Sequence, residues 1–235
     1  MTPLVPTPEL AARARLAGLL YLVIILAGLG AELGIRARLI DLSDADATSA
    51  AILAAPGLFR LSIAADLLMA LCDAGLAILL YLLFRPVAPA LALAAMIFRL
   101  IQTVLIAANL MAMQTAWLLL SGDATLPAAE TQGLALVFLD LHGHGYDLGL
   151  VFFGVNSLMT GVLIWRSGLF ARAFGLGIGA AGVVYLIGSG LRFFAPNLST
   201  AFSPAYGITI LAETAFCLRL LFQRARGVLP EDTRA

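Results

Sequence analysis

The chain has 235 residues, of which 62% are hydrophobic and 12% are charged, and its formal net charge is zero. Soluble domains carry about 25% charged residues, and a soluble fold of this length cannot bury so much apolar surface. The composition therefore excludes an ordinary soluble domain, and the balanced charge provides no field that would attract nucleic acid. A mean hydropathy of +1.01 instead indicates a protein that lies in a lipid bilayer.

Six stretches of the chain are apolar over about 20 residues, the length of helix that crosses a bilayer core of roughly 30 Å. They are Leu16–Ile35, Leu58–Phe84, Ala90–Leu120, Tyr146–Trp165, Phe174–Phe194 and Pro204–Phe222. The sequence therefore predicts an all-α integral membrane protein, a bundle of six transmembrane helices. Residues 1–15 would form an N-terminal segment, residues 16–222 the six-span domain and residues 223–235 a C-terminal tail.

Two segments between the spans have a predicted structure of their own. A short helix is expected at Asp46–Ala55, in the longest connection, where it would lie at the outer surface. Gln132–Leu141 is apolar but too short to cross a bilayer, so it is expected to form a separate helix. The sequence His142-Gly-His-Gly145 should separate that helix from the fourth span, because glycine weakens helices.

The arginines predict the orientation of the chain. If the six spans alternate, nine arginines fall on one side of the membrane: Arg13, Arg15, Arg85, Arg166, Arg172, Arg219, Arg224, Arg226 and Arg234. The other side receives Arg36, Arg38, Arg60 and Arg192. The positive-inside rule then places both termini in the cytoplasm. The absence of lysine and the abundance of alanine and leucine are typical of a GC-rich bacterial genome, so the bacterial cytoplasmic (inner) membrane is the expected location.

Ionisable residues inside the apolar stretches are the candidate functional residues, because a charge at the centre of a spanning helix costs about 2.5–3.5 kcal/mol. Asp66 and Asp73 share one face of the second span. A short turn joins the second and third spans. Counting outward from Val87 places Asp73 level with residue 101, which Arg99 and Gln102 flank. The sequence therefore predicts a buried ion pair between Asp73 and Arg99, which either fixes the helix packing or anchors a ligand.

That pairing leaves Asp66 and Glu213 without an evident cationic partner. Counted along their spans, both lie roughly 12–14 Å below the outer surface. His142 lies at the predicted start of the fourth span, from where its ring can turn inward. We therefore expect Asp66, His142 and Glu213 to meet in one water-accessible cavity, with Arg99 as a further lining residue.

The segment Asp140–Asp147 combines two carboxylates with two imidazoles, which are ligands that transition metals favour. One hypothesis is a divalent metal held by His142, His144 and Asp66. The other is that these polar residues form hydrogen bonds at the outer interface. Cys72 and Cys217 both lie in apolar runs and are expected to be unpaired core residues.

Several segments carry a resemblance to a known family. They are Ala14–Tyr21, Gly57–Leu67, Phe98–Gln102, Leu139–Gly154 and Arg166–Gly168. On these segments the chain resembles a bacterial family of uncharacterised multi-pass membrane proteins, DUF4386, over about residues 12–220. The resemblance implies six spans and implies no activity. Many relatives carry histidine at the position of Asn156, where this chain departs from them.

Three functions are compatible with these features. The leading one is a membrane protein that binds or transports a small molecule, ion or lipid through a polar cavity open to the outer side. The second is an intramembrane metal-dependent hydrolase acting on lipid, which would hold its metal with about three protein ligands. The third is a structural or partner-binding subunit whose buried charges only specify packing. The expected partners are the bilayer and a small-molecule or lipid ligand, and not nucleic acid.

Overall fold

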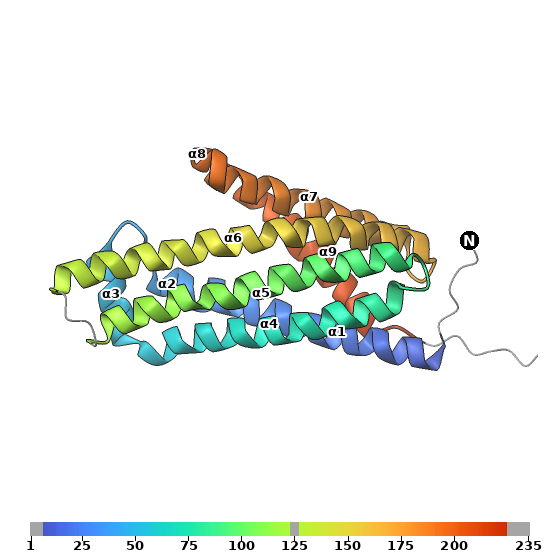
Figure 1. The fold of residues 1–235 in the computed structure, drawn as a ribbon, viewed down its shortest axis with the longest axis horizontal. Coiled ribbons are helices and arrows are strands. Elements are labelled where there is room, and N and C mark those ends of the chain that lie inside the picture. The colour runs from blue at the N-terminus through green and yellow to red at the C-terminus, as the bar shows by residue number, and fades with distance from the viewer. Residues whose placement is uncertain (1–6, 123–126, 225–235) are drawn as a thin grey trace, which may run out of the picture.

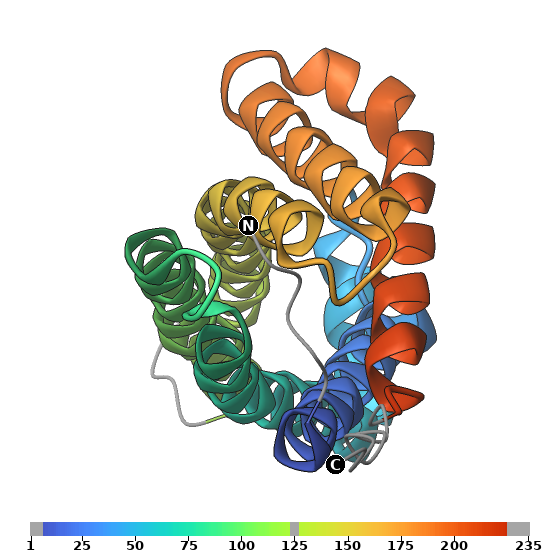
Figure 2. The same cartoon turned by 90° about the vertical axis from the view of Figure 1, so that its right-hand side faces the viewer.

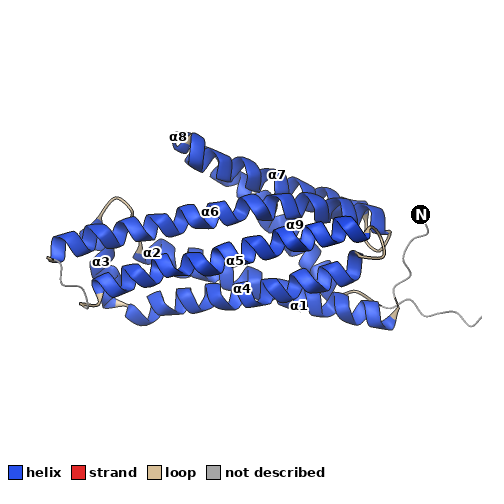
Figure 3. Ribbon diagram, viewed as in Figure 1, coloured by secondary structure: helices blue, strands red, loops and turns tan. Residues whose placement is uncertain are grey.

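A computed structural model describes residues 7–122 and 127–224, and all regular elements in this part of the chain are helical. Figure 3 shows these helices joined by short loops. The elements are α1 (Pro8–Leu29), η1 (Gly30–Arg36), α2 (Ala37–Leu39), α3 (Ala45–Ala54), α4 (Pro56–Phe84), α5 (Pro89–Leu120), α6 (Ala128–Ser167), α7 (Arg172–Phe194), α8 (Pro196–Phe202), η2 (Ser203–Ala205) and α9 (Tyr206–Leu221).

Six continuous helical stretches are long and apolar enough to cross a membrane, which confirms the prediction of six spans. They are Pro8–Leu39, Pro56–Phe84, Pro89–Leu120, Ala128–Ser167, Arg172–Phe194 and Pro196–Leu221. The outward side chains include leucine and methionine, such as Leu71 at 66% and Met111 at 73% exposure, whereas Asp66 and Arg99 are buried. Apolar side chains on the outer surface and charged side chains inside the bundle are what a lipid environment favours, because lipid offers no hydrogen bonds.

The six spans form a ring in chain order. Each span packs against the next one along the chain, and α9 packs against α1, which closes the ring. Figure 2 shows this ring viewed down its axis, with α1 (blue) next to α9 (red). Figure 1 shows α7 and α8 diverging from the other helices at one end of the bundle. Side chains that point to the axis of this ring can therefore meet partners from distant parts of the sequence.

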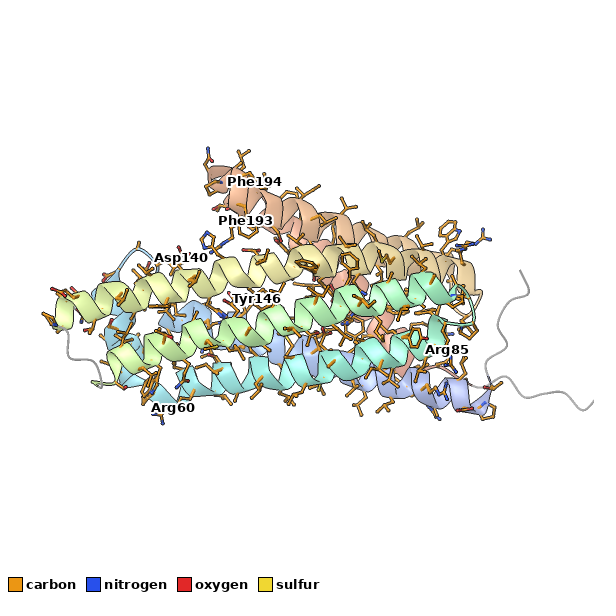
Figure 4. All side chains as sticks on the ribbon, in the orientation of Figure 1. Arg60, Arg85, Asp140, Tyr146, Phe193 and Phe194 are labelled. Atoms are coloured by element: carbon orange, nitrogen blue, oxygen red, sulfur yellow. The ribbon has the colours of Figure 1, made fainter. Side chains whose placement is uncertain are left out.

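The two ends of the ring differ in charge. α1 and α5 begin at one end and α4 and α6 end there, so that Arg13, Arg15, Arg85 and Arg166 gather at it. We call it the arginine-rich end, and it is the end at which Figure 4 labels Arg85. The opposite end, here called the far end, holds α3, the start of α4 and the start of α6 (Figure 1).

α6 is one uninterrupted helix of 40 residues, so the predicted break at His142-Gly-His-Gly145 is wrong. The two glycines provide close packing instead of a break. A Cβ atom on Gly143 would lie 2.6 Å from Nη2 of Arg192, and one on Gly145 would lie 2.2 Å from Oδ1 of Asn109. Packing against neighbouring spans offsets the cost of glycine in a helix, about 1 kcal/mol per residue relative to alanine.

The first span is longer than predicted at both ends. It begins at Pro8 and not at Leu16, and the π-helical segment η1 continues α1 into α2, so that it ends at Leu39 and not at Ile35. The sequence had placed Arg36 in the outer connection, but η1 carries it into the bundle, where it is 5% exposed. π-Helical turns are rare and occur often at functional sites.

The connection after α2 has the predicted short helix. It spans Ala45–Ala54, within one residue of the expected Asp46–Ala55. Asp44 caps it, because its side chain accepts a hydrogen bond of 2.9 Å from the backbone N–H of Ala47. Hydrogen bonds from the hydroxyl and the backbone N–H of Ser43 lower the pKa of Asp41, which lies in this connection.

Candidate functional site

At the middle of the ring, each of the six spans contributes one side chain to a connected group on the axis. We call this group the axial cluster. Its members are Tyr21 (α1), Asp73 (α4), Arg99 (α5), Phe153 (α6), Tyr185 (α7) and Glu213 (α9). Arg99 follows the first residue of α5, Pro89, by ten residues, or about 15 Å of helix. The axial cluster therefore lies about half a bilayer core away from the arginine-rich end.

Arg99 and Asp73 form the ion pair of the axial cluster. Nε and Nη2 of Arg99 donate to Oδ1 of Asp73 at 2.8 and 2.5 Å. The hydroxyl of Thr103 donates to Oδ2 at 2.6 Å, and the amide of Gln102, with its nitrogen turned toward Asp73, donates to the same oxygen at 2.8 Å. The carboxylate of Asp73 is thus fully bonded, and the structure brings together the two residues that the turn geometry placed level.

Glu213 joins the axial cluster through hydroxyl groups. Tyr185 donates to Oε1 at 2.5 Å, and Tyr21 donates to Oε2 at 3.0 Å. The guanidinium carbon of Arg99 lies 5.4 Å from the ring centre of Tyr21 and 5.0 Å from that of Phe153. The rings of Phe153 and Tyr185 are 5.1 Å apart. These contacts, together with the ion pair between Arg99 and Asp73, form a continuous network around the axis that connects all six spans.

A second group of polar residues lies nearer the far end. We call it the rim cluster, and it consists of Glu32, Arg36, Asp66, Asn109 and His142. Arg36 donates from Nη1 to Oδ2 of Asp66 at 2.6 Å and from Nε to Oε2 of Glu32 at 2.8 Å. Nε2 of His142 is 3.9 Å from Oδ2 of Asp66, and Nδ1 of His142 is 3.1 Å from the amide nitrogen of Asn109. The expectation that Asp66 lacks a cationic partner is wrong, because Arg36 reaches it.

The four residues expected to line one cavity fall into two clusters. Asp66 and His142 meet in the rim cluster, whereas Arg99 and Glu213 belong to the axial cluster. Asp66 and Asp73 are seven residues apart on α4, which separates the clusters by about 10 Å. The depth of Glu213 was underestimated, because the last span begins at Pro196 and not at Pro204.

A small cavity lies between α4, α5 and α6, on the arginine-rich side of Arg99, with room for about one water molecule. Its lining is Ala77, Leu80, Tyr81, Phe84, Ala92, Ala95, Met96, Arg99, Asn156, Thr160 and Leu163. Asn156 donates to the carbonyl of Ala95 at 2.7 Å, but its buried Oδ1 has no hydrogen-bond partner among the described residues. A buried oxygen without a partner beside a cavity is a position where a water or a ligand can donate. The cavity differs from the expected one, since Arg99 is the one residue of the four that lines it.

The residues predicted to hold a metal do not converge. Successive helix residues are turned by about 100°, so His142 and His144 point to different sides of α6. His142 is buried beside Asp66, whereas His144 is 42% exposed and lies 3.4 Å from Asp140. Within residues 7–122 and 127–224, no three His, Cys, Asp or Glu side chains come together in a way that could hold a metal ion. Cys217 is buried, as expected of a core residue, whereas Cys72 is only half-buried.

A further ion-pair network joins α6 to α7. Arg192 of α7 is 3.2 Å from Asp140 and 2.9 Å from Asp147. Figure 4 labels Asp140 and Tyr146 along this helix. The hydroxyl of Tyr146 contacts the sulfur of Met69 at 3.8 Å, in the layer between the two clusters.

Sequence reasoning missed Tyr21 and Tyr185 as residues of the site, and it named Asn156 only as a departure from the family. It searched for ionisable groups, whose cost in lipid makes them conspicuous. Hydroxyl and amide groups in the middle of apolar runs are the signal that would have found these three.

The comparisons with known proteins give one result. A family model described as a domain of unknown function, DUF4386, matches residues 16–223. The chain belongs to this family, as its resemblance indicated. No curated protein and no solved structure matches the chain.

Proposed function

We propose that this membrane protein is transport-like and that it binds a small solute or ion on the axis of its ring of helices. The axial cluster carries this proposal, because six helices that are distant in sequence each place one side chain on a common axis. One ion pair between neighbouring spans would be enough to fix their packing. Binding sites near the bilayer midplane, between helices, are common in transporters.

The surroundings of the axial cluster favour access from one side at a time. Toward the arginine-rich end, the small cavity with Asn156 and Thr160 reaches Arg99. Toward the far end, the rim cluster connects four of the six spans, because Arg36 of η1 and His142 of α6 both approach Asp66 of α4 and Asn109 of α5 contacts His142. We propose that the arginine-rich end faces the cytoplasm, because loops on that side of membrane proteins are enriched in arginine.

The two alternative functions make different demands on the same residues. A metal-dependent hydrolase would use Asp66 as a ligand, but Arg36 already binds both of its oxygens. A structural or partner-binding subunit would keep its axial residues away from water at all times. Access of water to the cavity therefore separates transport from a structural role.

Single cysteines test this access. In a chain with Cys72 and Cys217 replaced by serine, Thr160→Cys is exposed in membrane vesicles to a small, charged, membrane-impermeant thiol reagent. We expect Thr160→Cys to react in inside-out vesicles, because Thr160 lines the cavity. Ile164→Cys is the matched control, since Ile164 lies one turn further along α6 in the packed core and is fully buried.

The outcomes are distinct. Reaction at residue 160 and not at residue 164 supports an aqueous path to the axis. Reaction in right-side-out vesicles alone would reverse the proposed orientation. No reaction at residue 160 from either side would contradict transport and favour a structural subunit.

A further inference from the structure

We infer that Glu213 binds one positive charge, which is either a proton or a small monovalent cation such as Na⁺. A role for this charge in transport rests on the proposed function. The binding of the charge to Glu213 is argued from the contacts of Glu213 alone. Two observations carry the inference: the charges within the axial cluster do not cancel, and the groups around Glu213 are hydroxyl oxygens.

The axial cluster contains two carboxylates and one guanidinium. Arg99 directs both Nε and Nη2 to Asp73, and these two charges cancel. Glu213 contacts the hydroxyls of Tyr21 and Tyr185, and among the described residues no arginine or histidine lies within 4 Å of its carboxylate. An ionised Glu213 would therefore leave one net negative charge in the middle of the ring, where lipid makes such a charge costly.

Arg99 is not available to neutralise Glu213 as well. It is held between the rings of Tyr21 and Phe153, and its hydrogen bonds go to Asp73. If Arg99 turned to Glu213, Asp73 would become a buried carboxylate without a cationic partner. A buried charge without a partner strongly destabilises the folded protein.

The atoms around Glu213 suit a proton or an alkali cation. Tyr21 from α1 and Tyr185 from α7 reach different oxygens of the carboxylate. The buried Thr209 lies one turn before Glu213 on α9, and its hydroxyl donates to the backbone carbonyl of Tyr206 at 2.8 Å. Carboxylate and hydroxyl oxygens are hard ligands, unlike the thiolates and imidazoles that transition metals favour. One charge brings the cluster to neutrality, whereas a divalent ion would leave it positive.

The charged and titratable groups that face Glu213 are few. Among the described residues, they are Tyr21 of α1 and Tyr185 of α7, which contact its carboxylate, and the paired Arg99 of α5 and Asp73 of α4 in the same cluster. α6 contributes the apolar ring of Phe153 to this layer. A charge that arrives at the axis therefore has Glu213 as its one acceptor among these groups, because Asp73 is already fully bonded.

Two measurements on the purified full-length chain in lipid nanodiscs test the inference. Thermal unfolding is followed in NaCl and in choline chloride of equal ionic strength, and infrared spectra at neutral pH are searched for the carbonyl stretch of a protonated carboxyl group. Both are repeated on Glu213→Gln. The matched control is Glu130→Gln, which changes an exposed carboxylate in the first turn of α6.

If Glu213 binds Na⁺, NaCl raises the unfolding temperature of the native chain and of Glu130→Gln, but not of Glu213→Gln, because a ligand of the folded state stabilises it. If Glu213 binds a proton, the carboxyl band is present in the native chain and in Glu130→Gln and is lost in Glu213→Gln. A native chain without the band and without a response to Na⁺ would overturn the inference.

Tyr185→Phe provides a second variant should Glu213→Gln fail to fold. It removes one hydroxyl from the carboxylate, so we expect a shifted carboxyl band or about a tenfold weaker response to Na⁺, the equivalent of one ordinary hydrogen bond. An unchanged band and an unchanged response would overturn the inference. Neither result depends on the cysteine experiment, since Glu213 can hold a charge in a protein through which nothing moves.

Discussion

The rim cluster and the axial cluster contain the same kinds of carboxylate and arginine side chains, but the surroundings of these side chains differ. Each has two carboxylates and one arginine, and in each the arginine binds an aspartate of α4, either Asp66 or Asp73. The second carboxylates differ. Glu32 contacts Arg36 directly and is 63% exposed, whereas Glu213 is enclosed on the axis and contacts tyrosine hydroxyls.

The comparison shows that position relative to water, and not composition, decides what a surplus carboxylate requires. We expect water at the far end to screen the charge of the exposed Glu32, so that the arrangement needs no further cation. On the axis, a surplus charge must be neutralised by something bound there. We therefore interpret the same two-to-one ratio as structural in the rim cluster, and as the basis of the proposed charge binding in the axial cluster.

The largest effect is expected from breaking the axial ion pair. Asp73→Asn removes the carboxylate that Arg99 contacts directly, and removing one partner of such a buried pair costs about 3–5 kcal/mol. The double variant with Arg99→Gln should lose less than the sum of the two single variants, because no charge is left unpaired. Unfolding free energies in mixed micelles measure all four members of this cycle. Strict additivity would mean that the two residues do not stabilise each other.

The same change in the rim cluster should have a smaller effect. Asp66→Asn leaves Arg36 with Glu32 as a partner, so we expect a loss of about 1–3 kcal/mol, the cost of buried hydrogen-bonding groups that lose their partner. The substitution, the helix and the helix face match those of Asp73→Asn. Equal losses for the two variants would show that water does not reach the rim, and the distinction between the clusters would fail.

The smallest effect is expected from the exposed carboxylate. Glu32→Gln should change the unfolding free energy by less than about 1 kcal/mol, because exposed ion pairs contribute little. The change should also shrink as salt is added, since salt screens exposed charges. A loss as large as that of Asp66→Asn, independent of salt, would place Glu32 inside the bilayer and make the rim resemble the axis.

The sequence by itself determined the features that depend on local spacing. Six spans follow from the length of the apolar runs, because a helix rises by a fixed 1.5 Å per residue and the bilayer core has a fixed thickness. The pairing of Asp73 with Arg99 follows from similar counts on either side of a short turn, because Asp73 lies 14 residues before Val87 and Arg99 lies 12 residues after it. Asp44 and the residues after it form the helix α3, because a cap acts within a few residues.

Tertiary structure alone decided the features that depend on how the ring closes. Tyr21 and Glu213 are 192 residues apart and meet because α9 packs against α1. Arg36 reaches Asp66 because η1 continues the first span into the bundle, and α6 passes its glycines without a break because Arg192 and Asn109 pack there. Spacing along a chain gives the depth and face of a residue on its own helix, but which faces meet is set by packing between helices, and no local pattern records it.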